Sequence, residues 1–402
     1  MTRKMAQTTG PTTERALGLR LLGQHDLDGM GDGMQVIRHG DVVYVGHTGT
    51  SRAGTSILDV ADPRRPRLVD QWPAPDHTHT HKVQVADGLL LVNHERYPYR
   101  PTAPLGPHSA GVAIYDLADP LAPKQIAFWE SSGKGVHRIV WEGGRFAHVS
   151  ATPEGFTDRI WMLLDLSDPA NPVEAGRWWW PGQWAGGGEQ PDWPAGQRHA
   201  AHHALLDGNI AYLGYDDVNL VVLDIADPAA PQAIGFCRWG GGATHTCLPL
   251  DGRNLLVVTD EQQHDGPGAP SRRIHLLDVA DPTEPRYLTA LPEPEGEFAA
   301  LPMRYGPHCL HENRPGSFQS ERLIFATYFS AGVRVYDLAD PSRPREIAYW
   351  ISQAPPGQPV PQANDLFVDR HGLVWVTDRG HGGLFVLEPE GELAALMGRH
   401  HA

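Results

Sequence analysis

The sequence predicts an all-β fold, a seven-bladed β-propeller with four-stranded blades in which an N-terminal strand closes the last blade. Three observations favour this fold. A short motif recurs six times along the 402 residues, a second hairpin precedes the motif within the repeat, and the two ends of the chain complement one another. A repeat of this length is typical of propeller blades and of other repeat architectures.

The recurring motif is a short apolar run followed by Asp-x-x-Asp-Pro. The apolar run predicts a buried strand, which ends because aspartate side chains cap turns and proline lacks the N–H group that a sheet needs. A further apolar run follows the turn, for example PKQIAFW at residues 123–129. The motif therefore predicts the third and fourth strands of a blade. Its first aspartates, spaced 49 to 59 residues apart, are Asp59, Asp116, Asp165, Asp224, Asp278 and Asp337.

A second hairpin lies upstream of the motif. Its turn carries an acidic residue or a histidine before glycine, as in VQVADGLLLV at residues 83–92 and ALLDGNIAYL at residues 204–213. Asp-Gly between two apolar runs is a strong signal for a tight hairpin. This hairpin supplies the first and second strands, so that each repeat forms one four-stranded antiparallel blade.

The seventh repeat is incomplete. Residues 365–391 supply three strands, whereas residues 16–27 resemble a fourth strand that has no blade before it. We therefore expect a disordered leader (1–15), a single propeller domain (16–391) and a C-terminal tail (392–402). Closing the ring in this way leaves few exposed sheet edges.

Composition and charge exclude several classes of function. The formal net charge of −15 argues against nucleic acid or an anionic membrane as the main partner. No apolar stretch approaches the length of a membrane span, and the N-terminal residues lack the apolar core of a signal peptide. The three cysteines show no disulfide spacing. We expect a cytoplasmic protein with a small-molecule substrate and with neither a nucleic-acid nor a membrane partner.

Many of the 22 histidines fall at one end of the repeats, opposite the Asp-Pro turns. Counting seven residues back from the hairpin glycine gives the start of the innermost strand of a blade. In the seventh repeat that position is Asp365. In five other repeats the strand begins at or beside a histidine, namely His81, His137, His202, His245 and His308.

Five equivalent imidazoles around one axis favour a metal site, because neutral imidazole is a common ligand of transition metals. We predict that three or four of these five histidines bind a divalent transition metal. A histidine-rich set with few carboxylates suits iron or copper, and also zinc or manganese, better than calcium or magnesium. A metal-free site with acid–base chemistry and a polar lining of the ring are the alternatives.

Further polar residues are expected at the same end. Glu95, Glu261 and Asp365 are candidates to orient a ligand imidazole or to act as catalytic general bases. Lys82 and Arg138 directly follow a ring histidine, so strand alternation predicts that they point away from it, either into an ion pair between blades or toward a substrate. The histidines expected to contact substrate or to support the ligands are His79, His94, His203, His311 and His381.

The apolar run followed by Asp-x-x-Asp-Pro, written here as LDVADP, YDLADP, LDLSDP and LDIADP, closely resembles the LVIVD-repeat family of β-propellers over residues 34–388. That resemblance implies the fold and no particular activity. More remotely, the axial histidines resemble those of the selenium-binding protein/methanethiol oxidase group and of the carotenoid-cleaving oxygenases, where axial histidines hold copper or iron. Some propeller lyases use axial histidines around manganese, so this fold-level likeness does not select one reaction.

These observations predict a metal-dependent enzyme that acts on a small organic substrate, with oxidoreductase chemistry as the leading class. A zinc- or manganese-dependent hydrolase or lyase on the same site is the second hypothesis. The third is a non-catalytic propeller scaffold for protein interactions, which predicts an exposed apolar patch in place of converging histidines.

Overall fold

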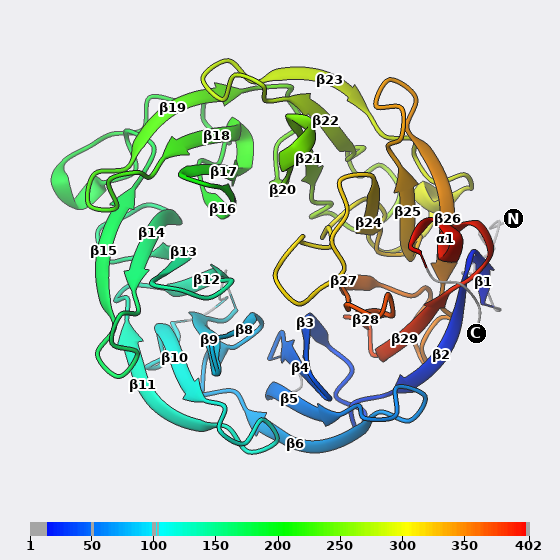
Figure 1. The fold of residues 1–402 in the computed structure, drawn as a ribbon. Helices are drawn as coiled ribbons and strands as arrows, with labels where there is room; N and C mark the ends of the chain where they lie inside the picture. Colours follow the sequence, from blue (N-terminus) through cyan, green and yellow to red (C-terminus); the bar gives the residue numbers. More distant parts are fainter. Residues whose placement is uncertain (1–13, 50–51, 99–101, 103, 399–402) are drawn as a thin grey trace, which may run out of the picture.

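The computed structural model describes residues 14–49, 52–98, 102 and 104–398. Antiparallel sheets stand side by side around a central axis, each with one strand near the centre and one at the rim (Figure 1). The predicted all-β propeller class is confirmed. None of the helices within the described ranges is both long and apolar enough to cross a membrane.

Three sheets run in chain order from the centre to the rim. Their strands are β3 (Gly33–His39), β4 (Val42–His47), β5 (Ala53–Asp59) and β6 (Arg67–Pro73); β16 (Ala201–Asp207), β17 (Ile210–Tyr215), β18 (Asn219–Asp224) and β19 (Gln232–Cys237); and β20 (Thr244–Leu250), β21 (Leu255–Asp260), β22 (Ile274–Asp278) and β23 (Arg286–Ala290).

Two further units are joined into one nine-stranded sheet, because Gly135 of β12 pairs with Glu95 of β9. In the first unit the innermost strand is split into two short pieces, β7 and β8. The strands are β7 (Thr78–His79), β8 (Val83–Ala86), β9 (Leu89–Arg96), β10 (Gly111–Asp116) and β11 (Lys124–Glu130), followed by β12 (Gly135–Val140), β13 (Phe146–Thr152), β14 (Ile160–Asp165) and β15 (Val173–Trp178).

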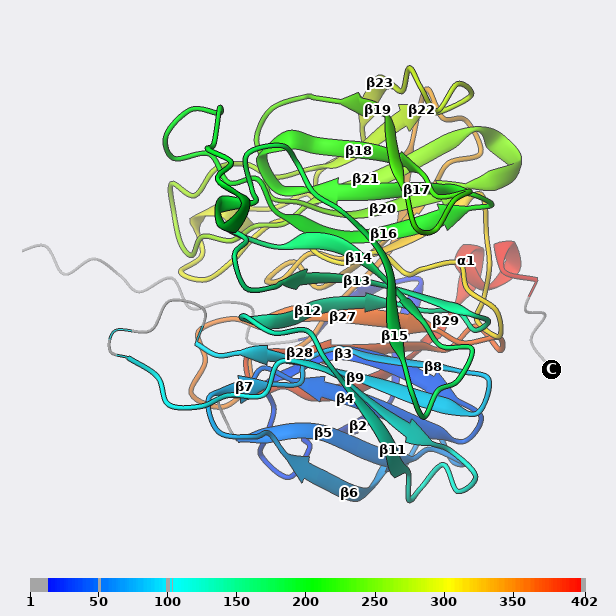
Figure 2. The same cartoon turned by 90° about the vertical axis from the view of Figure 1, so that its left-hand side faces the viewer.

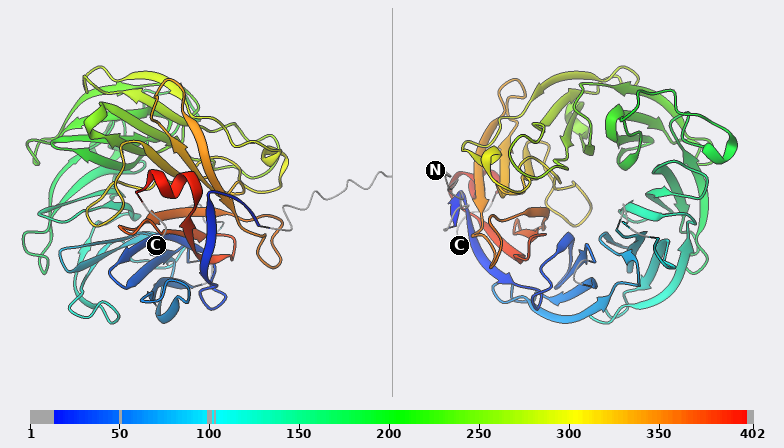
Figure 3. Two further views of the ribbon diagram at one scale, coloured as in Figure 1. Left: turned by 45° about the vertical axis from the view of Figure 1, so that its right-hand side comes forward. Right: turned by 180° about the vertical axis from the view of Figure 1, so that it is seen from behind.

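The last two sheets combine the first two strands of the described chain with its last six strands, so its two ends lie close together (Figure 3). The segment expected as one N-terminal strand forms two, and the positive φ of Gly18 (68°) separates them. The first pairs with β26 and the second with β29. The strands are β24 (Leu323–Thr327), β25 (Val333–Asp337), β26 (Arg345–Ile351) and β1 (Arg15–Leu17), and then β27 (Ala363–Val368), β28 (Val374–Asp378), β29 (Gly383–Pro389) and β2 (Leu19–His25).

The expected leader and tail are only partly described. Residues 1–13 and 399–402 lie outside the described ranges, and Arg15 already belongs to β1. The start of the tail forms a helix whose Leu393 is buried. The helical elements of the described residues are η1 (Ala185–Gly187), η2 (Asp216–Val218), η3 (Asp251–Arg253), η4 (Phe298–Ala300) and α1 (Gly391–Leu396).

Apolar side chains of neighbouring sheets pack together and hold the ring. For example, Val43 and Leu58 share one cluster with Val83 and Leu90 of the next sheet, and all four are fully buried. Burying such a side chain contributes about 1.5–3 kcal/mol. Because each sheet shares its faces with its neighbours, the blades form one cooperative unit.

The Asp-x-x-Asp-Pro turns have the predicted structure in all six copies. In the first copy Asp59 Oδ1 accepts the N–H of Ala61, and Asp62 Oδ1 accepts the N–H of Arg64, both at 3.0 Å. The same two hydrogen bonds recur in the other five copies. From the side, β7 and the insertion between β15 and β16 lie toward one face of the ring, and α1 lies toward the other (Figure 2).

A candidate metal centre at the ends of the inner strands

The ring histidines lie where the innermost strands lose their regular pairing. Register shifts interrupt β12, β16 and β20, and these steps enclose His137, the pair His202 and His203, and His245. His81 lies in the equivalent break between β7 and β8. A bulge places extra residues on one strand and redirects their side chains. The same irregularity, repeated from blade to blade, therefore aims these imidazoles at one centre.

Consecutive imidazoles are in contact around this centre. The ring centroids are 5.0 Å apart for His81 and His137, 5.1 Å for His137 and His202, 3.7 Å for His202 and His245, and 4.5 Å for His245 and His308. All five side chains are buried. The structure thus brings together the five histidines that were singled out as metal ligands.

The closest nitrogen atoms face each other. Nε2 of His137 lies 3.3 Å from Nε2 of His202, and Nδ1 of His202 lies 2.7 Å from Nδ1 of His203. One nitrogen each from His202, His203 and His245 also fall within 4.8 Å of one another. His245, His308 and Cys309 form a second group of this kind. Each of these two groups of three is compact enough to hold a metal ion.

Other polar groups fix the orientation of the ring imidazoles through Nδ1. Glu95 Oε2 lies 2.8 Å from Nδ1 of His137 and 2.8 Å from Nε2 of His79. Nδ1 of His308 donates to the carbonyl oxygen of Asn364 at 2.6 Å. For His137 and His308 the proton is therefore on Nδ1, and Nε2 carries the lone pair that a metal can accept.

His81 differs from these two. Its Nδ1 lies 3.1 Å from Nδ2 of Asn93, whose amide orientation is fixed because Oδ1 accepts the N–H of Lys82 at 2.7 Å. His81 Nδ1 must then accept, which leaves the proton of the neutral ring on Nε2. Within the described residues this buried Nε2 has no hydrogen-bond partner. His81 is thus a hydrogen-bond donor at the centre.

Burial keeps these imidazoles neutral. It lowers the pKa of His137, His202 and His245 well below the ordinary value, and the neighbouring positive charges lower it further. The pKa of His308 falls to about 3, chiefly through burial. Because neutral imidazole is the form that binds metal, the site is ready for a cation at neutral pH.

The three candidate carboxylates have different surroundings. Glu95 orients His137, as described above. Glu261 Oε1 lies 3.1 Å from Arg304 Nη1 and 3.7 Å from His308 Nε2. Burial alone would raise the pKa of Glu261, but the positive charges of its neighbours, Arg304 among them, outweigh this effect and the pKa is lowered. Asp365 is buried and accepts the N–H of Leu366 at 2.9 Å, and burial raises its pKa.

Three candidate histidines lie away from the cluster. His94 Nδ1 lies 2.8 Å from Ser109 Oγ, and its ring packs against Phe128. His311 uses both ring nitrogens on the backbone, accepting the N–H of Val368 and donating to the carbonyl oxygen of Phe318. His381 is exposed. These three have no visible role at the centre, and His311 anchors the chain segment that follows it.

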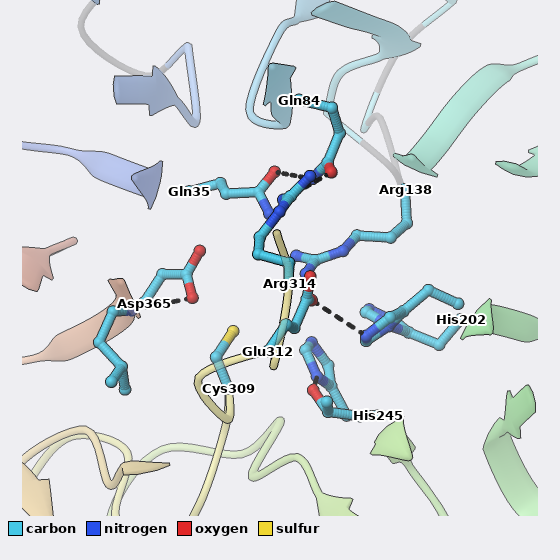
Figure 4. Close-up of polar contacts among 12 residues, drawn as sticks. Gln35, Gln84, Arg138, His202, His245, Cys309, Glu312, Arg314 and Asp365 are labelled. Atoms are coloured by element: carbon cyan, nitrogen blue, oxygen red, sulfur yellow. Dashed lines mark hydrogen bonds and ion pairs between the residues drawn. The ribbon is translucent and has the colours of Figure 1, made fainter. Parts of the chain in front are cut away.

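That segment carries polar residues that the sequence did not reveal. Between η4 and β24 the chain turns into the centre of the ring (yellow to gold in Figure 1). Glu312 and Arg314 point inward there, between His202 and His245 on one side and Cys309 and Asp365 on the other (Figure 4). Neither residue occupies a position that recurs in the other repeats, so the period of the sequence could not identify them.

Arg138 also reaches the centre. The bulge at His137 breaks the alternation that was expected to turn Arg138 away, and its Nη2 donates to Glu312 Oε1 at 2.6 Å. This contact is an ion pair between blades, one of the two roles predicted for it. The bulge shifts the side-chain phase of the strand, which lets Arg138 reach the centre of the ring.

Comparisons with known proteins agree with this fold. Residues 200–238 match the model of the LVIVD repeat. The chain is similar to the periplasmic gluconolactonase of Pseudomonas aeruginosa, with a TM-score of 0.56, 13% identity and coverage of 92% of this chain and 94% of that one. It is also similar to the computationally designed Ika8 protein, with a TM-score of 0.51, 10% identity and coverage of 91% and 98%. A search of the curated proteins found no match.

Proposed function

We propose that this chain is a seven-bladed propeller, closed by its N-terminal strand, that binds a divalent transition metal at the inner-strand histidines and catalyses a reaction of a small organic substrate. His137, His202 and His245 are the proposed ligands, with His308 as a fourth. One observation carries the proposal: His137 is oriented by Glu95 through Nδ1, while its Nε2 faces His202 Nε2 at 3.3 Å.

The donor chemistry fits such an ion. Two neutral imidazoles with facing nitrogen atoms either share a proton or bind a common cation, and a carboxylate behind one of them is a frequent partner of metal-bound histidine. An imidazole set without a direct carboxylate ligand favours iron or copper. When bound, such an ion supplies one-electron chemistry, which makes oxidoreductase the leading class.

The surrounding residues have distinct proposed roles. Glu95 holds the ring of His137 in place and increases its basicity. Burial of the imidazoles restricts water at the centre. Glu261 is partly exposed (14% of its side chain) and lies beside His308, so we assign it as the candidate proton acceptor near the solvent side. We further propose a cytoplasmic protein.

A hydrolase or lyase that uses zinc or manganese is the second candidate. The low pKa of Glu261 keeps a carboxylate ionised beside His308, as a general base requires. A similar propeller is a gluconolactonase, although 13% identity relates only the folds. The identity of the bound metal discriminates between the two classes, because zinc has no redox chemistry.

Elemental analysis of protein purified without an affinity tag tests the proposal. We expect about one transition-metal ion per chain in the parent protein and a large loss in the His137→Ala and His245→Ala variants. The matched control is His94→Ala, because His94 lies outside the cluster, and this variant should keep its metal. A parent protein without stoichiometric metal would refute the proposal.

A further inference from the structure

Three cationic side chains are buried beside the imidazole cluster and are not used by the proposed metal site. Lys82, Arg138 and Arg314 are 2%, 2% and 4% exposed. Arg138 donates through Nη2 to Glu312, but within the described residues its Nε and Nη1 have no hydrogen-bond partner. Unpaired donors of a buried guanidinium are costly, so they indicate a group that binds there.

Carboxylates surround these cations, but they leave donors of Arg138 unpaired. Glu312 and Asp365 lie at the centre (Figure 4), and the charges of Glu261 and Glu142 also act on Lys82 and Arg314, respectively. Burial raises the pKa of Asp365 and so disfavours its negative charge, although Arg138 and Lys82 oppose this effect. Arg314 is held by two neutral acceptors, Gln84 Oε1 and the carbonyl oxygen of Trp141. The unpaired Nε and Nη1 of Arg138 are therefore the groups that an anion would satisfy.

A further donor points to the same kind of ligand. The contact with Asn93 leaves the proton of His81 on Nε2, and this buried N–H has no partner among the described residues. Arg138, Lys82 and His81 all belong to the inner edges of two adjacent blades.

These donors lie close to the proposed ligands. After burial, the charges of Arg138 and Lys82 are the largest influences that lower the pKa of His203. His203 Nε2 in turn lies 3.6 Å from Glu312 Oε1, the partner of Arg138. A ligand bound to Arg138 would therefore touch the same group of imidazoles that the metal needs.

We propose that the substrate is a small carboxylate, whose anionic group is bound by Arg138, Lys82 and the Nε2–H of His81 beside the histidine cluster. This inference rests on the proposed function, because it assigns the substrate class of that site. Glu312 competes with the substrate for Arg138. The fork of donors on arginine matches the oxygen atoms of a carboxylate, and a metal among neutral imidazoles adds further positive charge.

Saturation-transfer NMR with acetate, and with acetamide as its neutral isostere, tests the assignment on the protein as purified. We expect acetate to bind and acetamide not to bind. Arg138→Met should weaken acetate binding by about tenfold or more, because it removes a charge-assisted hydrogen bond. Arg145→Met is the matched control, since Arg145 is exposed and pairs with Asp165, and it should bind acetate like the parent.

Glu312→Gln is an independent test, because it should strengthen acetate binding where Arg138→Met weakens it. It leaves Arg138 in place and removes the competing carboxylate, so acetate affinity should rise by about threefold or more. If circular dichroism shows that Arg138→Met does not fold, the acetate affinity of Glu312→Gln tests the inference on its own. Equal binding of acetate and acetamide, absence of acetate binding in the parent, or an unchanged or lower affinity in Glu312→Gln would overturn the inference.

The metal content of every sample is measured in parallel. Acetate binding that persists in Arg138→Met but disappears in metal-depleted His137→Ala would place the anion on the metal and overturn the role of Arg138. A parent protein that lacks metal but binds acetate through Arg138 would instead refute the proposed function and retain the anion site. Failure of the anion site and failure of the metal site therefore give different results.

Discussion

The two ends of each repeat differ in regularity. At one end, the two aspartates of the Asp-x-x-Asp-Pro turn accept the same pair of backbone N–H groups in all six copies. At the other end, His81, His137, His202 and His245 lie at interruptions of the inner strands, and each has a different partner. The identical contacts at the turns stabilise the fold, because every blade needs the same turn. The differing contacts indicate a site assembled from several blades at once.

The largest effect is expected from His137→Ala. Removing this imidazole deletes a proposed ligand, and loss of a supporting partner alone typically weakens metal binding 10–100-fold, so we expect a loss of more than about 100-fold. Metal affinity is measured by competition with a chelator of known affinity. A variant that binds metal like the parent would show that the irregular end of the repeats is not a metal site.

Glu95→Gln should lower the metal affinity less than His137→Ala does. The amide keeps the size of the side chain but carries no negative charge, so its hydrogen bonds to His137 and His79 are weaker and the ring of His137 is held less firmly. Metal affinity should fall by about 10–100-fold. Retention of full affinity together with loss of thermal stability would reassign Glu95 to a purely structural role.

Acid pH should destabilise the protein through histidines that are buried in the neutral form. His148 lies near the hairpin turn of its blade, and burial lowers its pKa to about 4. Between an unfolded value of about 6.5 and this folded value, only the unfolded state takes up the proton, so stability falls as pH decreases. The slope is about 1.4 kcal/mol per pH unit.

His148→Leu tests this prediction, because it removes the titrating group and keeps an apolar side chain of similar size. Denaturant unfolding between pH 6.5 and pH 4.5 should show a slope that is smaller by about 1.4 kcal/mol per pH unit in the variant. Its metal content should equal that of the parent. An unchanged slope would mean that His148 is protonated in the folded protein.

The smallest effect is expected at the regular end. Asp59→Ala removes the acceptor for the N–H of Ala61 and the ion pair with Arg67 in one of six equivalent turns. Loss of such a turn cap costs about 1 kcal/mol. Urea unfolding measures this change, and metal content and acetate binding should not change. Loss of metal in this variant would show that the two ends of the repeat are coupled.

The sequence predicts the regular end better than the irregular one. Spacing alone identified Asp59 and its equivalents, and the offset from the hairpin glycines identified the five histidines that meet in the structure. Both inferences use the period of the repeat, which depends on local turn chemistry. The sequence also proposed Glu95 as a group that orients a ligand imidazole, which agrees with its contact to His137.

The features that the sequence did not reveal are those that break the period. A bulge has no residue signature here, so strand alternation did not predict that Arg138 reaches the centre and pairs with Glu312. Glu312 and Arg314 reach the centre through a turn found in only one repeat. His311 lies at the correct end of its repeat, yet it binds two backbone groups, because a fold-specific loop packs against it.

The most direct test of the account is anomalous X-ray scattering from crystals, recorded at the absorption edge of the metal that elemental analysis identifies. One peak is expected at the centre of the ring, about 2.0–2.1 Å from Nε2 of His137, His202 and His245. Absence of a peak there, or a peak only at the exposed group of His25, Asp26 and Asp28, would contradict it.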